Sequence, residues 1–76
     1  MNKRRRALLE SANNLLGQAE AIVQRVADQE SDSMDNMPEG LQSSDQYEKM
    51  EQALENLESA LEYIGDARKC LEDASE

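Results

Sequence analysis

Apolar residues recur at alternating intervals of three and four along the second half of the chain. The series starts at Tyr47 and Met50 and is interrupted once, at Arg68; its other members are Leu54, Leu57, Leu61, Ile64 and Leu71. This spacing places the residues on one side of a helix and is typical of a heptad seam between packed helices. A column of small residues runs beside it: Ala53, Ala60, Ala67 and Ala74. We therefore predict a helix over about residues 44–74 that a neighbouring helix approaches closely along this edge.

The first half of the chain repeats the design with three apolar columns. They consist of Leu8, Leu15 and Ile22; of Leu9, Leu16 and Val23; and of Ala12, Ala19 and Val26. After Val26 the columns meet polar residues, and the apolar pattern resumes only at Met34 and Met37. The columns predict another helix over about residues 3–36, with an apolar stripe as wide as that of its neighbour.

The only proline separates the two patterns. Pro38 disfavours helical geometry at the residue before it, and Gly40 adds turn chemistry shortly afterwards. We expect a corner over about residues 37–43, after which Ser43 or Ser44 caps the next helix. A connection this short makes the helices antiparallel neighbours, and folding about Gly40 pairs residues whose numbers sum to about 80.

Three apolar columns on each helix exceed what a two-helix seam covers, because such a seam uses mainly two. A lone hairpin would leave an apolar strip in water, and a second copy covers that strip in a four-helix bundle. We therefore predict an all-α fold in which residues 1–76 form one antiparallel, coiled-coil-like two-helix hairpin, which self-associates as a homodimer or higher oligomer. The residues expected to carry the interaction are large members of the columns: Leu8, Leu15, Ile22, Leu54, Leu57, Leu61, Ile64 and Leu71.

The residue types that most enzymes use are scarce. Histidine is absent and Cys70 is the only cysteine, so neither a disulfide within the chain nor a thiol–imidazole pair can form. Asp28, Glu30 and Asp32 have the spacing of calcium ligands in an EF-hand loop, but Ser33 occupies the place where that loop needs glycine. We predict a protein that is not an enzyme and has no catalytic, cofactor-binding or metal-binding residues.

The charge of the chain restricts its partners. Eight basic and seventeen acidic residues give a formal net charge of −9, which disfavours general binding to nucleic acid or anionic lipid. No apolar run approaches the roughly 18 residues of a membrane span, and no signal-peptide core follows the basic start. We expect a cytoplasmic protein without membrane contact.

The leading hypothesis is a non-enzymatic protein–protein interaction or structural module, and two alternatives remain beside it. Glutamates at seven-residue spacing imitate a charged rod, as an acidic DNA mimic that inhibits a nucleic-acid-binding protein would: Glu48, Glu55 and Glu62 on one line, and Glu51, Glu58 and Glu72 on another. Alternatively, a basic arm makes weak, salt-sensitive contact with nucleic acid through Lys3, Arg4, Arg5 and Arg6.

Arg68 interrupts the seam of the later helix. A charge in a seam is costly unless it is paired, so we expect Arg68 at an edge of the seam, paired with Glu72 or Glu10. The other interpretation is a device that specifies the oligomer. A large change in oligomer number on substitution by leucine favours this second interpretation.

The run DNMPEGLQSSDQYEKMEQALENLESALEYI, residues 35–64, contains a corner of the form Asp-Asn-Met-Pro-Glu-X-Leu-Gln-X-Ser, then a Tyr-Glu-Lys-Met segment and a Leu-rich acidic helix. In these features it resembles a type of small acidic helical-hairpin protein found among bacterial and phage-associated open reading frames. The resemblance implies a helical hairpin and carries over no activity. The basic start of the chain lies outside the resembling part.

Overall fold

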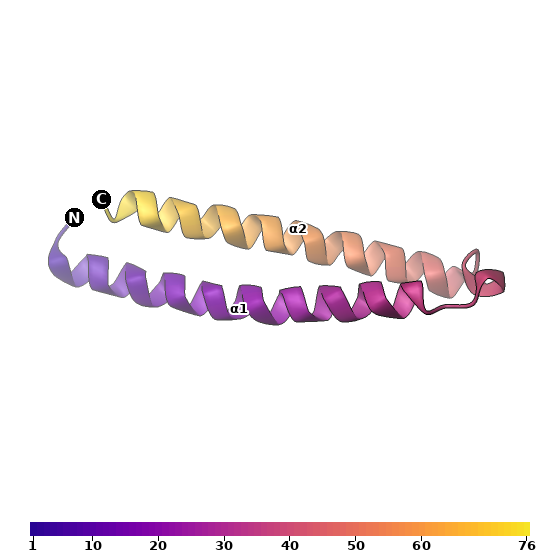
Figure 1. Cartoon of the computed structure of the whole chain (residues 1–76). Coiled ribbons are helices and arrows are strands. Elements are labelled where there is room, and N and C mark those ends of the chain that lie inside the picture. The colour runs from indigo at the N-terminus through magenta and orange to yellow at the C-terminus, as the bar shows by residue number, and fades with distance from the viewer.

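Two long helices and a short corner make up the chain. The computed structural model describes all 76 residues and consists of α1 (Lys3–Asp35), a short 3-10 helix η1 (Glu39–Leu41) and α2 (Asp45–Ala74). The helices lie side by side and antiparallel, so both chain termini lie at one end (Figure 1). There is no strand, which confirms the all-α hairpin predicted from the heptad spacing.

Side chains fix where each helix begins. Asn2 caps α1, its Oδ1 accepting the Arg5 backbone N–H at 2.8 Å. Ser44, one of the two candidate caps, precedes α2: its Oγ accepts the Tyr47 backbone N–H at 3.3 Å and donates to the Leu41 carbonyl at 2.6 Å. This cap therefore satisfies a free amide of α2 and also ties the helix to the corner.

The corner sets a helix register that differs from the predicted one. Gly17 lies against Arg68 and Glu20 lies near Gly65, so the numbers of facing residues sum to about 85 rather than about 80. The chain runs outward past the last turn of α1, forms η1 beyond the ends of both helices and then returns into α2 (Figure 1). Because this path is not symmetric about Gly40, each pair across the seam is shifted by about five residues, more than one helical turn.

The hairpin has the shape of a rod. Its principal extents are 59, 14 and 13 Å, and its radius of gyration is 17.3 Å, against about 11 Å for a globular domain of this length. It exposes 5841 Å², whereas a globular monomer of the same mass exposes roughly 4,700 Å². Ala27 is the only buried residue. One hairpin therefore has almost no core of its own.

Candidate protein-interaction surfaces

The seam between the helices is half-buried. On α2 it consists of the predicted series, in which every member is partly shielded: Tyr47, Met50, Leu54, Leu57, Leu61, Ile64, Arg68 and Leu71. On α1 the shielded residues follow the same alternation and include polar side chains: Leu9, Asn13, Leu16, Glu20, Val23, Ala27, Glu30 and Met34. The two series occupy the a and d heptad positions of an antiparallel coiled coil. The a positions are Asn13, Glu20, Ala27 and Met34 on α1 and Tyr47, Leu54, Leu61 and Arg68 on α2, and the other members of each series are d positions. The predicted interaction residues of α2 therefore serve the contact within the hairpin.

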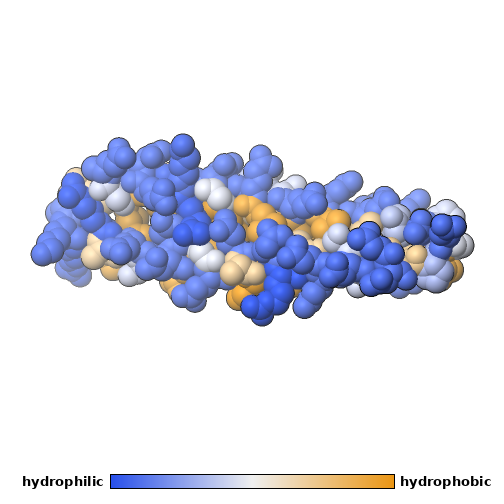
Figure 2. Space-filling view, in the orientation of Figure 1, coloured by the Kyte–Doolittle hydropathy of each residue, from blue (hydrophilic) through white to orange (hydrophobic).

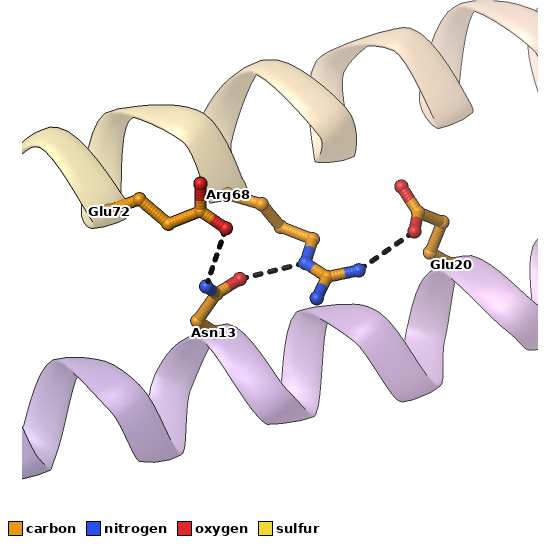
Figure 3. Close-up of polar contacts among 4 residues, drawn as sticks. All are labelled: Asn13, Glu20, Arg68 and Glu72. Carbon is orange, nitrogen blue, oxygen red and sulfur yellow. Dashed lines mark hydrogen bonds and ion pairs between the residues drawn. The ribbon is translucent and has the colours of Figure 1, made fainter.

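A polar network crosses the seam in the half of the hairpin that holds the termini (Figure 3). Arg68 Nε donates to Asn13 Oδ1 at 2.7 Å, and Arg68 Nη1 donates to Glu20 Oε1 at 2.9 Å. Asn13 Nδ2 in turn donates to Glu72 Oε1 at 3.5 Å. The expected ion pair of Arg68 with Glu72 or Glu10 is therefore wrong, because the observed register presents Asn13 and Glu20 to the guanidinium instead.

Gly17 makes room for this network. A Cβ atom at Gly17 would lie only 3.1 Å from the guanidinium carbon of Arg68 and from both of its Nη atoms. The side chains of Arg68 and Glu20 keep 32% and 35% of their surface exposed, so their ion pair contributes ~1 kcal/mol or less. The main consequence of the network concerns register, since its donors and acceptors meet only when Arg68 lies between Asn13 and Glu20.

Large apolar residues of α1 remain outside the seam. Leu8, Leu15 and Ile22, all predicted interaction residues, keep 60%, 64% and 58% of their surface exposed. Val26 in a neighbouring column is exposed too, and on α2 Tyr63 is 71% exposed. The hairpin thus leaves in water the apolar strip expected when a two-helix seam meets three apolar columns.

Most apolar residues outside the seam lie on one broad side of the hairpin. They occupy c and g heptad positions: Leu8, Ala12, Leu15, Ala19, Ile22 and Val26 on α1, and Ala53, Ala60, Tyr63, Ala67, Cys70 and Ala74 on α2, where they stand beside the polar Lys49 and Asn56. Antiparallel helices that pack through equivalent a and d positions are related by an approximate two-fold axis perpendicular to the broad side. Equivalent heptad positions therefore share a side, and we call these residues the apolar face.

The opposite broad side is polar and acidic. The b and e positions of α2 carry glutamates that are all exposed: Glu48, Glu51, Glu55, Glu58, Glu62 and Glu72. None of them forms an ion pair, since the one in the structure joins Arg68 to Glu20. Figure 2 shows a broad side of the hairpin on which hydrophilic side chains prevail, while hydrophobic ones are visible between the helices and in places along the lower margin. We call these glutamates the acidic face.

The basic residues near the start of the chain belong to a helix. Lys3, Arg4, Arg5 and Arg6 form the first turn of α1 rather than a free arm, and all of them are exposed. Both termini lie at the same end of the hairpin (Figure 1), but no ion pair joins this cluster to the acidic end of α2. Positive charge at a helix N-terminus opposes the helix dipole, so the cluster gains nothing from its own helix.

Other chemistry has little to build on. No three histidine, cysteine or carboxylate side chains gather closely enough to hold a metal ion. Asp28, Glu30 and Asp32 lie on α1 and not in a loop, and Cys70 is an exposed free thiol. Neither helix combines the length and the apolar character that crossing a membrane requires.

Comparison of the chain with protein-family models, with curated proteins and with solved structures finds no match. A function for the chain therefore has to be argued from the apolar face, the acidic face and the basic first turn of α1.

Proposed function

We propose that this chain is a non-enzymatic protein–protein interaction module that self-associates through its apolar face. The main support is the placement of apolar residues from both helices on one broad side, with the acidic face on the other. Two copies that pack face to face would enclose the apolar residues and leave the glutamates in water. The product is a homodimeric four-helix bundle.

Burial of surface favours this dimer. Fully burying one large apolar side chain contributes about 1.5–3 kcal/mol, and each copy offers Leu8, Leu15, Ile22 and Tyr63 with more than half of their surface exposed. The hairpin also exposes roughly 1,100 Å² more than a globular monomer of its mass. This excess is larger than the ~800 Å² that each partner contributes to an interface of standard size. A second copy thus supplies the core that one hairpin lacks.

Substitution of exposed apolar residues tests the proposal. Leu15→Gln combined with Ile22→Gln removes central members of the apolar face, and the seam stays intact because both residues lie outside it. We expect light scattering to show a dimer for the native chain at micromolar concentration, and the variant to dimerise at least about a hundredfold more weakly, or not at all, because each dimer loses the burial of four apolar side chains.

Ala21→Gln is the matched control. Ala21 is an exposed alanine of α1 at a b position, on the side away from the apolar face. Its substitution should therefore leave the protein a dimer by light scattering. A double variant that dimerises as tightly as the native chain would remove the support for this interface.

The acidic face favours a second function, that of a DNA mimic which inhibits a nucleic-acid-binding protein. Its glutamates are exposed, form no ion pairs and stay outside the proposed dimer contact. Competition with duplex DNA for a basic DNA-binding protein tests this function at rising salt, because electrostatic binding weakens steeply with ionic strength. Replacing Glu55 and Glu58 by glutamine should reduce the displacement of DNA, and no displacement even at low salt would exclude the mimic.

The first turn of α1 supports a weaker alternative, salt-sensitive contact with nucleic acid through Lys3 to Arg6. Deletion of residues 2–6 should then abolish binding to duplex or single-stranded DNA at low salt. If the intact chain shows no binding under these conditions, the idea fails.

We place the module in the cytoplasm, where the exposed thiol of Cys70 stays reduced. We extend the same architecture to the bacterial and phage-associated proteins that the corner resembles.

A further inference from the structure

The two long edges of the apolar face carry opposite net charge. The f heptad positions that border the face are all exposed: Arg4, Ser11, Gln18, Arg25 and Asp32 on α1, with a net charge of +1, and Gln52, Ser59, Asp66 and Asp73 on α2, with a net charge of −2. We call the first set the basic edge and the second set the acidic edge. Because the edges flank the surface buried in the proposed dimer, they come close to the edges of the second copy.

A two-fold axis can join two such faces in two ways. If the axis is parallel to the helices, α1 of one copy packs on α2 of the other, and both corners lie at the same end. If the axis runs across the helices, α1 packs on α1, α2 packs on α2, and the corners lie at opposite ends. The first arrangement sets the basic edge beside the acidic edge, whereas the second sets each edge beside its own copy.

We infer that the dimer adopts the first arrangement, with α1 packed on the partner's α2 and the two corners together. This geometry presupposes the self-association proposed above. In the second arrangement, Asp66 and Asp73 would border the aspartates of the other copy, whereas in the first they would border an α1 edge whose net charge is positive. Juxtaposed like charges disfavour an interface and complementary charges select its orientation, so the charged edges favour the first arrangement.

Side-chain sizes fit the same pairing. With the axis parallel to the helices, α1 meets the partner's α2 at the same height, close to the register within the hairpin, where facing numbers sum to about 85. The heptad layers nearest to this register, in which facing numbers sum to 82, place large residues on small ones: Leu8 on the partner's Ala74, Leu15 on the partner's Ala67, Ile22 on the partner's Ala60, and Ala19 on the partner's Tyr63. Such alternation lets the helices interdigitate closely along the contact.

Cys70 distinguishes the two arrangements. In the first, the α2 helices lie diagonally across the bundle, so the two Cys70 thiols are too far apart for a disulfide and each faces the partner's Ala12. In the second, the α2 helices touch along their apolar residues, so both Cys70 thiols lie in one contact and are closer together than in the first.

Mild oxidation of the native chain and of an Ala12→Cys variant tests the inference on a non-reducing gel. We expect the native chain to remain non-covalent and the variant to become mainly covalent dimer, with disulfides between residues 12 and 70 of different copies, identified by peptide mass. Ala21→Cys puts the new thiol on the other broad side, and Cys70→Ser in the Ala12→Cys background removes the second thiol. Both controls should lose the covalent dimer.

Other disulfides would overturn the arrangement. A native chain that oxidises to a Cys70-linked dimer, or a variant that joins residue 12 to residue 12, supports the axis across the helices. Disulfides between residues 12 and 70 of the same chain also count against the inference. Light scattering of the reduced native chain separates these results from failure of the proposed function, since a reduced monomer defeats self-association itself, whereas a reduced dimer with the wrong disulfides defeats only its geometry.

Discussion

Polar residues determine which apolar column of α1 packs in the seam, and Arg68 is the example. Its guanidinium finds acceptors in Asn13 and Glu20, which occupy a positions of the α1 seam. The sequence contains a signal for this choice, because Leu9, Asn13, Leu16 and Glu20 alternate by four and three as the α2 series does. By hydropathy alone the leucine columns of α1 are equivalent. The seam of α1 was therefore not predictable from apolar spacing, although its polar members could have been matched to Arg68.

Gly17 and Gly65 form a matched pair for testing the network. Both lie inside helices, where alanine is favoured over glycine by about 1 kcal/mol. At Gly65 a new Cβ meets only Glu20 Oε2 at 3.9 Å, an ordinary contact, whereas at Gly17 it meets the Arg68 guanidinium at 3.1 Å. We expect Gly65→Ala to raise the free energy of unfolding by about 0.5–1 kcal/mol. Gly17→Ala should raise it less or lower it, because Arg68 must give up hydrogen bonds to move.

Urea denaturation at one fixed protein concentration measures both changes. The concentration must be the same because oligomerisation shifts apparent stability. An equal rise in the free energy of unfolding for Gly17→Ala and Gly65→Ala would show that the Arg68 guanidinium is not held against Gly17.

The helices themselves were predictable as elements because independent signals agree on them. The apolar spacing defines their faces, Pro38 and Gly40 separate them, and Ser44 caps α2. The observed bounds, Lys3–Asp35 and Asp45–Ala74, lie within one residue of the expected ranges. The register was not predictable in this way, because it depends on the path of the corner. Counting residues about Gly40 treats that path as symmetric, and η1 makes it asymmetric.

Ser44 and Ser43 test how much the corner depends on the cap of α2. Ser44→Ala removes both side-chain hydrogen bonds, to the Tyr47 amide and the Leu41 carbonyl, and should lower the free energy of unfolding by about 1 kcal/mol. Ser43 is exposed, so Ser43→Ala should change it by no more than about 0.5 kcal/mol. Thermal unfolding followed by circular dichroism compares them. A larger loss of unfolding free energy for Ser43→Ala than for Ser44→Ala would mean that Ser43, and not Ser44, caps α2.

The whole molecule is a two-sided rod. Three apolar columns per helix predict that one column must be left over, but they do not specify which. The register decides that Leu8, Leu15 and Ile22 are left out, and the antiparallel packing puts the remainder of both helices on one side. The net charge of −9 favours hydration of the rest of the surface, which leaves the apolar face as the contact in the proposed dimer.

Sedimentation equilibrium of the reduced native chain, from nanomolar to high micromolar concentration, tests self-association most directly. The proposed dimer should have about twice the 8.5 kDa mass of the chain at micromolar concentration. On dilution the mass should fall together with the helical circular dichroism, because a single hairpin has almost no core. A helical, cooperatively melting species of 8.5 kDa at every concentration would contradict the dimer.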